Sequence, residues 1–256
     1  MWKKMRYQLI NKVKRAIKMF QLLEDGDKVA IGVSGGKDSI ILLYSLYTIK
    51  KIWPIKIELN SVFLDLGWEI DYSEVKAFSE SLDIPFHYVK TDIGKIVFEE
   101  REEKNPCSLC ANMRRGALNT YAKSIGCNKV ALGHHMDDCV ETFMLSLTYE
   151  GRINTFAPKV FLDRTEITVI RPLIFVYEKD IIKMIEKHQL PTAKKACPID
   201  GKSKRQEIKE LLADMVKNNP KAKDKMMNAI TNQIWSDFNE NFEKNSIPKK
   251  EGNSDN

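Results

Sequence analysis

The sequence predicts an α/β protein in which helices cover both faces of a parallel β-sheet. Two observations support this fold class. Short apolar, β-branched runs alternate along the chain with amphipathic segments of helical period, and polar residues follow the ends of two of these runs. Strands that alternate with helices are typical of βαβ units. Ligands of such open sheets bind at the carboxyl ends of the strands, so we expect the functional residues at that edge.

The individual elements follow from residue spacing. Apolar runs predict strands, and apolar residues three and four positions apart predict helices. The expected strands are residues 28–33, 57–64, 86–90, 129–133 and 168–170, and the expected helices between and after them are residues 37–51, 71–82, 109–125, 138–149 and 178–188. This succession is typical of a Rossmann-like sheet.

Helical segments are also expected at both ends of the chain. Residues 1–24 are assigned to an amphipathic N-terminal helix, whose basic face is either solvated or in contact with phosphates. Residues 25–190 form the α/β domain, and residues 191–243 form a helical C-terminal appendage with helices at 204–216 and 221–238. Residues 244–256 are polar and lack apolar periodicity, which predicts a disordered tail.

Composition narrows the class of protein. The chain has 256 residues and a net charge of +6, which is consistent with a polyanionic partner. No segment approaches the roughly 18 to 20 apolar residues of a membrane span, and no signal peptide is recognisable, so a cytoplasmic protein without membrane contact is expected. Five cysteines, two of them in a C-x-x-C arrangement, favour metal or redox chemistry over disulfides.

A glycine-rich turn joins the first strand to the following helix. Glycines let the backbone approach an anion, a helix N-terminus presents unpaired N–H groups, and a lysine adds a full positive charge. A Walker A loop is disfavoured, since it would have Gly and Ser or Thr where this chain has Ile31 and Asp38. The predicted phosphate-binding residues are Ser34, Gly35, Gly36, Lys37, Asp38 and Ser39.

Polar residues follow two further strands. Asp65 ends the second strand, and the run G-H-H-M-D-D follows the fourth, from Gly133 to Asp138. Asp137 and Asp138 are candidate Mg²⁺ ligands, although capping the next helix is an equally good use for one of them. His134 and the histidine beside it favour a positioning role over binding of a transition metal.

The cysteines differ in context. Cys107 and Cys110 open a predicted helix, a place that favours thiolate ligands, and the pair alone is compatible with zinc, an iron–sulfur cluster or a redox dithiol. A closed zinc site is poorly supported because no second C-x-x-C pair exists. Cys127 and Cys139 fit burial as small apolar residues, whereas Cys197 lies in a predicted loop that suits a ligand.

The sequence S-G-G-K-D-S resembles the PP-loop of the N-type ATP pyrophosphatases, and G-H-H-x-D-D resembles a second signature of that class. The resemblance implies that ATP binds here, that pyrophosphate leaves from the loop, and that Lys37 neutralises the phosphates. It further implies that Asp38 and Asp138 hold Mg²⁺. Asp65, Gly133, His134 and Asp137 would lie near the nucleotide.

A closer resemblance links the chain to the tRNA 2-thiocytidine synthetase family, TtcA. The segments P-C-S-L-C-x-x-x-R-R-G-x-L, A-L-G-H-H-x-D-D and I-R-P-L with E-K-D-I carry it, and it extends from about Asp25 to Met226. It implies a 4Fe-4S cluster held by Cys107, Cys110 and Cys197, which with Lys37 and Asp38 would form the catalytic set. Many relatives have a second C-x-x-C at the last position, where this chain continues from Cys197 with Pro-Ile-Asp.

The resemblance implies an ATP-dependent tRNA sulfurtransferase that adenylates a base carbonyl and then inserts sulfur, with a 2-thiocytidine-type product. A cysteine desulfurase or free sulfide would supply the sulfur, and the enzyme would act alone or as a homodimer. The residues expected to bind RNA phosphates are Arg114, Arg115, Lys202, Lys204 and Arg205.

Other functions remain open. A sulfurtransferase of the same class could act on another tRNA base or a small molecule. An amidating or lysine-ligating PP-loop enzyme would need no cluster, and a nucleotide-binding redox sensor would show no turnover. The 2-thiouridine enzymes of the TtuA type are disfavoured because no zinc-type C-x-x-C pair occurs before Cys107 or after Cys197.

Overall fold

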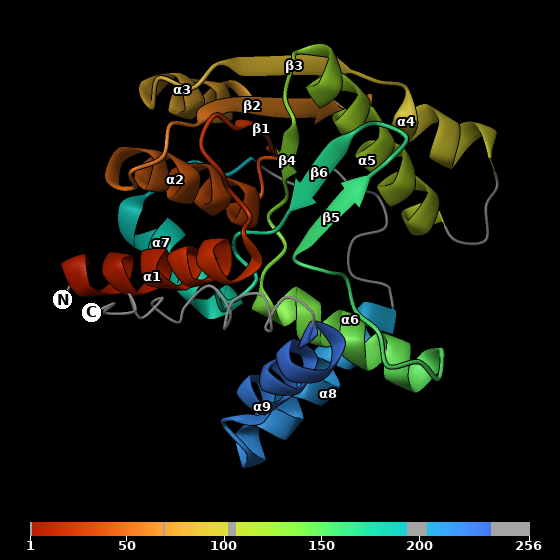
Figure 1. Cartoon of the computed structure of the whole chain (residues 1–256). Helices are drawn as coiled ribbons and strands as arrows, with labels where there is room; N and C mark the ends of the chain where they lie inside the picture. Colours follow the sequence, from red (N-terminus) through yellow and green to blue (C-terminus); the bar gives the residue numbers. More distant parts are fainter. Residues whose placement is uncertain (1, 69, 102–105, 194–203, 237–256) are drawn as a thin grey trace, which may run out of the picture.

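The computed structural model describes residues 2–68, 70–101, 106–193 and 204–236. Its centre is a six-stranded sheet in the order β3-β2-β1-β4-β6-β5 (Figure 1). All neighbouring strands are parallel except β5, which runs antiparallel to β6. The strands are β1 (Lys28–Gly32), β2 (Glu58–Asp65), β3 (Phe86–Lys90), β4 (Lys129–Ala131), β5 (Lys159–Leu162) and β6 (Ile167–Ile170).

The predicted α/β class and every predicted strand are confirmed, whereas the antiparallel edge strand β5 was not predicted. The predicted helices also occur, with ends shifted by a few residues; the one predicted at 221–238 is an α-helix followed by a π-helix, and its last two residues lie outside the described residues. The helices are α1 (Trp2–Phe20), α2 (Lys37–Ile52), α3 (Ser73–Ser81), α4 (Ile93–Lys95), η1 (Ile96–Glu100), α5 (Pro106–Ser124), α6 (Met136–Tyr149), α7 (Glu178–His188), α8 (Lys204–Asn218), α9 (Ala222–Ala229) and η2 (Ile230–Ile234). Of these, α4 and the π-helix η1 were not predicted.

The sheet is buried on both faces. Val29 and Ile31 of β1 are fully buried in a large apolar cluster that includes residues of α1, α2 and α7. Ala30 lies between them in sequence and packs on the other face, with Leu118 and Ala122 of α5. Successive strand residues point to opposite faces, so this arrangement explains the continuous apolar run of β1.

The terminal helices share this core. Val13 of α1, Leu212 of α8, Met227 of α9 and Trp235 after η2 belong to the same cluster as the sheet. The C-terminal part is helical, as predicted, while the domain limits at residues 24, 190 and 243 stay predictions. The predicted tail at 244–256 lies outside the described residues.

The basic face of α1 is occupied by protein contacts. Lys14 and Lys18 lie 5.8 and 5.7 Å from the ring centroid of Trp53. Arg15 lies 4.4 Å from the ring centroid of Phe175. Cation–π contacts of this kind stabilise the packing of a basic helix. The face is therefore neither simply solvated nor open along its whole length for phosphates.

The order of strands fixes where a ligand can bind. β2 and β3 lie on one side of β1, and β4 and β6 lie on the other. The chain therefore leaves β1 and β4 at a topological switch point, where open α/β sheets bind ligands beyond the strand ends. Among the described helices, none is both long and apolar enough to cross a lipid bilayer.

Candidate nucleotide and cluster site

The phosphate loop forms a tight turn between β1 and α2. Gly35 has φ +79°, and a Cβ there would lie 2.6 Å from the Cβ of Ala193, so only glycine fits. Ser39 Oγ accepts from the backbone N–H of Ser34 at 3.2 Å and donates to the carbonyl of Gly36 at 2.8 Å. Gly36 caps α2 without a side-chain hydrogen bond, so the first N–H groups of α2 are available to an anion.

The loop after β4 touches the phosphate loop. A Cβ on Gly133 would lie 3.1 Å from the backbone carbon of Asp38 and 3.2 Å from the nitrogen of Ser39. Glycine at position 133 thus allows two backbone segments to approach each other closely. The two sequence motifs, about 100 residues apart, are neighbours at the switch point, as the parallel sheet requires.

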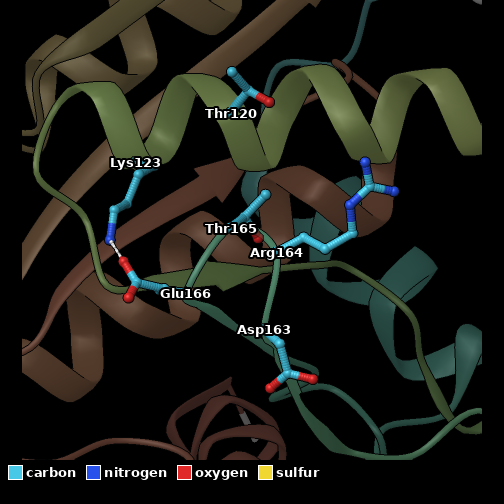
Figure 2. A pocket seen from close by; sticks show the side chains of 6 residues that line it. All are labelled: Thr120, Lys123, Asp163, Arg164, Thr165 and Glu166. Carbon is cyan, nitrogen blue, oxygen red and sulfur yellow. Dashed lines mark hydrogen bonds and ion pairs between the residues drawn. The ribbon is translucent and has the colours of Figure 1, made fainter.

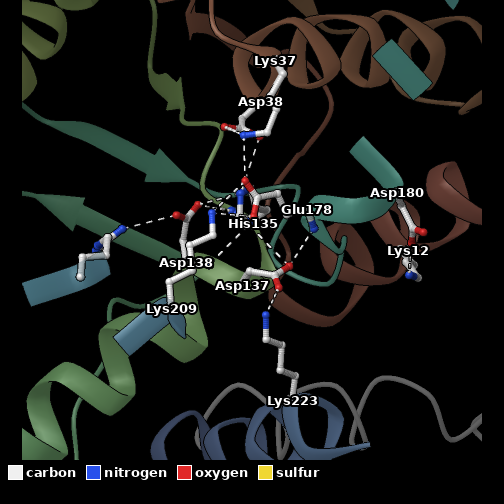
Figure 3. A network of polar contacts seen from close by, with 11 residues as sticks. Lys12, Lys37, Asp38, His135, Asp137, Asp138, Glu178, Asp180, Lys209 and Lys223 are labelled. Atoms are coloured by element: carbon white, nitrogen blue, oxygen red, sulfur yellow. Dashed lines mark hydrogen bonds and ion pairs between the residues drawn. The ribbon is translucent and has the colours of Figure 1, made fainter. Parts of the chain in front are cut away.

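Lys37 is part of a charge network (Figure 3). Its Nζ lies 3.1 Å from a carboxylate oxygen of Asp38 and 3.1 Å from Glu178 Oε1. Lys209 Nζ lies 3.0 Å from Glu178 Oε2. Burial acts to lower the pKa of Lys37, but Asp38 and Glu178 overcome it and raise this pKa. Burial acts to raise the pKa of Glu178, but the two lysines lower it to about 2, so Lys37 and Glu178 are both charged at neutral pH.

Asp38 and Asp138, the predicted Mg²⁺ ligands, meet at His135. Its Nε2 lies 3.6 Å from Asp38 Oδ1 and 3.5 Å from Asp138 Oδ2. Asp38 Oδ1 is buried and has no hydrogen-bond partner among the described residues, which leaves this oxygen available to a cation. In the part of the chain that the structure describes, no three His, Cys, Asp or Glu side chains form a ready metal cage.

The two aspartates after β4 also stabilise helix N-termini. His135 and Asp138 form a capping box for α6, in which His135 Nδ1 accepts from Asp138 N–H and Asp138 Oδ2 accepts from His135 N–H. Asp137 accepts from the N–H of Glu178 at 2.7 Å and from Lys223 Nζ at 2.6 Å. Asp138 therefore helps to cap the helix that follows, as expected for one of the two, whereas Asp137 bonds the start of α7, which was not predicted.

His134 is held against an aromatic ring. Its ring centroid lies 5.0 Å from that of Phe156, and its buried Nδ1 lacks a hydrogen-bond partner among the described residues. Burial, helped by Arg171, lowers the pKa of His134 to about 4. The imidazole is therefore neutral at physiological pH. A neutral, half-buried ring is compatible with the predicted positioning role.

Asp65 ends β2 at the same edge of the sheet. It accepts from the N–H of Gly67 at 2.9 Å and from the hydroxyl of Tyr88. The hydrogen bond with Asp65 raises the pKa of Tyr88 to about 12. The Asp65 carboxylate therefore stabilises the turn after β2 and is hydrogen-bonded to Tyr88 of β3.

Cys107 and Cys110 occupy the first turn of α5, as predicted. Cys107 is exposed, whereas Cys110 is buried beside Leu66, Ile93 and Val97. The chain reaches α5 from the carboxyl end of β3 and leaves it for the start of β4, so this turn lies on the side of the sheet that carries the phosphate loop.

Cys127 and Cys139 are buried, as predicted for apolar cysteines. Burial raises the pKa of both thiols, that of Cys139 to about 12. The third predicted cluster ligand, Cys197, lies outside the described residues. Ala193, four positions before it, donates its N–H to the carbonyl of Gly35 at 3.0 Å.

The predicted RNA-binding residues are only partly described. Arg114 and Arg115 are exposed on α5, one turn beyond Cys110. Lys204 lies 4.5 Å above the ring of Tyr149. Arg205 contacts Asp138 at 3.4 Å and the hydroxyl of Thr142 at 3.1 Å, which brings it to the predicted nucleotide site. Lys202 lies outside the described residues.

A surface hollow of about 490 Å³ lies elsewhere (Figure 2). Lys123, at the end of α5, and Glu166, just before β6, both line it and form a 2.6 Å ion pair. Both residues precede the amino ends of parallel strands, so the hollow lies at the sheet edge opposite the phosphate loop. It is therefore separate from the predicted site.

Three residues of the charge network were not predicted as site residues: Glu178, Lys209 and Lys223. Glu178 belongs to the E-K-D-I segment that the sequence analysis noted, and this was a usable signal for it. Lys209 and Lys223 lie on lysine-rich helices without a distinctive motif. Only the packing of α8 and α9 brings them to Glu178 and Asp137.

Comparison with known proteins is consistent with the geometry. The PP-loop domain family matches residues 5–215. The tRNA-cytidine(32) 2-sulfurtransferase of Geobacter sulfurreducens is 40% identical over 232 residues, which cover 89% of this chain and 90% of the relative. The protein of the same name from Coxiella burnetii is 36% identical, with coverage of 90% and 91%.

Among solved structures, the chain resembles the U34-tRNA thiolase NcsA from Methanococcus maripaludis, determined with its 4Fe-4S cluster. The TM-score is 0.67 at 24% identity, and the match covers 93% of this chain and 79% of that chain. NMN synthetase from Francisella tularensis matches with a TM-score of 0.51 at 16% identity and covers 83% and 86% of the two chains. These two likenesses support the fold.

Proposed function

The chain belongs to the PP-loop domain family and, within it, to the tRNA-cytidine(32) 2-sulfurtransferases, and on this premise we propose that it replaces O2 of a tRNA cytidine by sulfur at the expense of ATP. The geometry that carries the proposal is the phosphate loop: a helix N-terminus without a side-chain cap lies beside Lys37 and contacts the Gly133 loop at the switch point. By the names of its relatives, the acceptor would be cytidine 32.

ATP makes the base oxygen a leaving group. O2 of the base attacks the α-phosphate, and the bond between the α-phosphate and the β-phosphate breaks. The pyrophosphate that leaves would be bound by the loop at residues 34–39. A sulfide sulfur then bonds to C2, and the C2–O bond breaks with release of AMP, which keeps the oxygen. Lys37 would stabilise the negative charge that develops on the phosphates.

We propose Asp38 as the principal ligand of a Mg²⁺ ion that accompanies ATP, with Asp138 as the second. Carboxylate oxygens are preferred ligands of this ion, and Mg²⁺ is commonly held by one or two of them together with phosphates. Asp38 Oδ1 is buried and accepts no hydrogen bond from the described residues, which supports this assignment.

A 4Fe-4S cluster would be held by Cys107, Cys110 and Cys197. When bound, a cluster with three protein ligands leaves one iron available to carry sulfur. Cys107 and Cys110 lie one helical turn apart, at the start of a helix on the functional side of the sheet. The backbone N–H of Ala193 donates a hydrogen bond to Gly35 of the phosphate loop. Cys197 is four residues further along the chain, and four residues of extended chain span at most about 14 Å.

The tRNA phosphates would contact Arg114, Arg115, Lys202, Lys204 and Arg205, while the target base leaves its stack to reach the loop. Arg205 beside Asp138 supports an RNA path close to the nucleotide. The sulfur source, a cysteine desulfurase or free sulfide, and a homodimer stay predictions.

The test is anaerobic purification followed by measurement of iron, labile sulfide and 2-thiocytidine formed in tRNA with ATP. We expect about four irons per chain, as a 4Fe-4S cluster requires, and loss of iron and product in Cys107→Ala, Cys110→Ala and Cys197→Ala. Cys127→Ala is the matched control and should retain both. Product formed without iron would contradict the cluster, and equal thiolation of a tRNA with uridine at position 32 would contradict the acceptor.

A further inference from the structure

The first turn of α9 contacts the wall of the nucleotide site at two points. Lys223 Nζ lies 2.6 Å from Asp137 Oδ1, and the two side chains are only 20% and 8% exposed. The next residue, Asp224, accepts a hydrogen bond from the hydroxyl of Tyr177. Tyr177 immediately precedes α7, so adjacent residues of α9 hold both the start of α6 and the start of α7.

Asp137 also contacts α7 directly. Its second oxygen accepts from the backbone N–H of Glu178, the first residue of α7, at 2.7 Å. The N-cap residue Tyr177 supplies no side-chain cap. Asp137 therefore provides the cap from another helix and places a negative charge at the positive end of the α7 dipole.

Glu178 in turn contacts the phosphate loop. Its carboxylate lies 3.1 Å from Lys37 and 3.0 Å from Lys209. A continuous series of polar contacts thus leads from Lys223 to the carboxylate of Asp137, from there to the backbone N–H of Glu178, and from the Glu178 carboxylate to Lys37 (Figure 3). The series joins α9 to the residue that is expected to meet the phosphates of ATP.

We propose that Lys223 is a positioning residue for ATP. Its pairing with Asp137 holds the start of α7, so that Glu178 keeps Lys37 at the loop. It also neutralises a buried carboxylate that would otherwise repel the phosphates. The inference rests on the proposed binding of ATP at residues 34–39. A merely structural ion pair would change the melting temperature but not the affinity of the folded protein for nucleotide.

The test is calorimetric titration of the full chain with α,β-methylene-ATP and magnesium, because this analogue is not cleaved and needs no tRNA or cluster. We expect Lys223→Met to raise the Kd about tenfold, and Tyr177→Phe, which removes one of the two contacts, to raise it about threefold. Lys223→Arg keeps the charge and should stay within about twofold of the wild type. Lys225→Met, at an exposed position of the same helix, is the control and should bind as the wild type does.

Melting temperatures without nucleotide accompany each titration. Binding by Lys223→Met equal to that of Lys225→Met would overturn the proposal, as would an equal loss in Lys223→Arg. If Lys223→Met does not fold, Tyr177→Phe decides, and an unchanged Kd overturns the inference. Failure of the wild type itself to bind the analogue would instead contradict the proposed function.

Discussion

Lys37 and Asp38 are neighbours at the start of α2 but have different electrostatic surroundings. Lys37 contacts two carboxylates, which raise its pKa against the effect of burial. One carboxylate oxygen of Asp38 pairs with Lys37. The other oxygen is buried and has no hydrogen-bond partner among the described residues. The charged Lys37 can bind phosphate oxygens, and the buried carboxylate oxygen of Asp38 can bind a metal ion. Together they suit a metal-bound polyphosphate.

Lys37→Met should lower the rate of pyrophosphate release at least about a hundredfold, because it removes a charge that opposes the developing negative charge on the phosphates. Lys50→Met, at an exposed position near the end of the same helix, should stay within about twofold of the wild type. Pyrophosphate release in the presence of tRNA is the measurement. A similar loss in both variants would contradict a specific role for Lys37.

His134 should make folding stability depend on pH. Its folded-state pKa is about 4, well below its ordinary value of 6.5, so the unfolded chain takes up the proton first as the pH falls. Stability is therefore lost between about pH 6.5 and 4, by roughly 3 kcal/mol for this shift. His134→Gln should remove this part of the pH dependence in urea unfolding, whereas His188→Gln should change it less. Identical pH profiles of wild type and His134→Gln would contradict the assignment.

At the scale of elements, the start of β4 is tied to the connection between α1 and β1. Lys129 Nζ lies 2.7 Å from Asp27 and donates to the carbonyl of Leu22, and both side chains of the ion pair are about 5% exposed or less. Asp27 also accepts from the N–H of Glu24 and from the side chain of Asn128. This pair fixes the amino ends of adjacent strands, away from the phosphate loop.

Lys129→Met should destabilise the fold by about 3 to 5 kcal/mol, because it leaves the Asp27 carboxylate buried and unpaired. The control is Lys28→Met at the start of the neighbouring strand, whose partner Glu58 is exposed, and it should cost less than about 1 kcal/mol. The free energy of unfolding in urea is the measurement. Equal costs for the two variants would show that the buried pair is dispensable.

At the scale of the whole molecule, the described helices of both termini and the sheet bury their apolar residues in one cluster. Trp235, after η2, packs edge-on against Phe20 of α1 with ring centroids 5.5 Å apart. The end of the first helix and the last described segment therefore contact each other in the core. Shared burial of this kind predicts that the C-terminal helices unfold together with the sheet.

Leu212→Ala on α8 should lower the free energy of unfolding by about 2 to 5 kcal/mol, since Leu212 is fully buried. Its neighbour Leu211 is 47% exposed, and Leu211→Ala should cost less than about 1 kcal/mol. Urea unfolding followed by circular dichroism and by tryptophan fluorescence should show the same midpoint shift for Leu212→Ala. Separate midpoints for the two probes would indicate that the C-terminal helices unfold independently.

Much of the fold could be predicted because its signals are local. The strand β1, the glycine turn and α2 follow one another within about 25 residues, and apolar periodicity defines each of them. The exceptions are short. β5 has four residues and is partly exposed, and α4 with η1 spans eight residues, so neither contains enough apolar repeats to be recognised.

The sequence by itself determined the order of elements, the phosphate loop, the cysteine pair and the edge at which function is expected, because spacing along the chain encodes them. Only the tertiary structure decided what surrounds Lys37. Lys223 and Asp137 are 86 residues apart, and Glu178 lies on yet another helix. Such contacts depend on how whole helices pack against the sheet, and this packing cannot be predicted from the local sequence pattern.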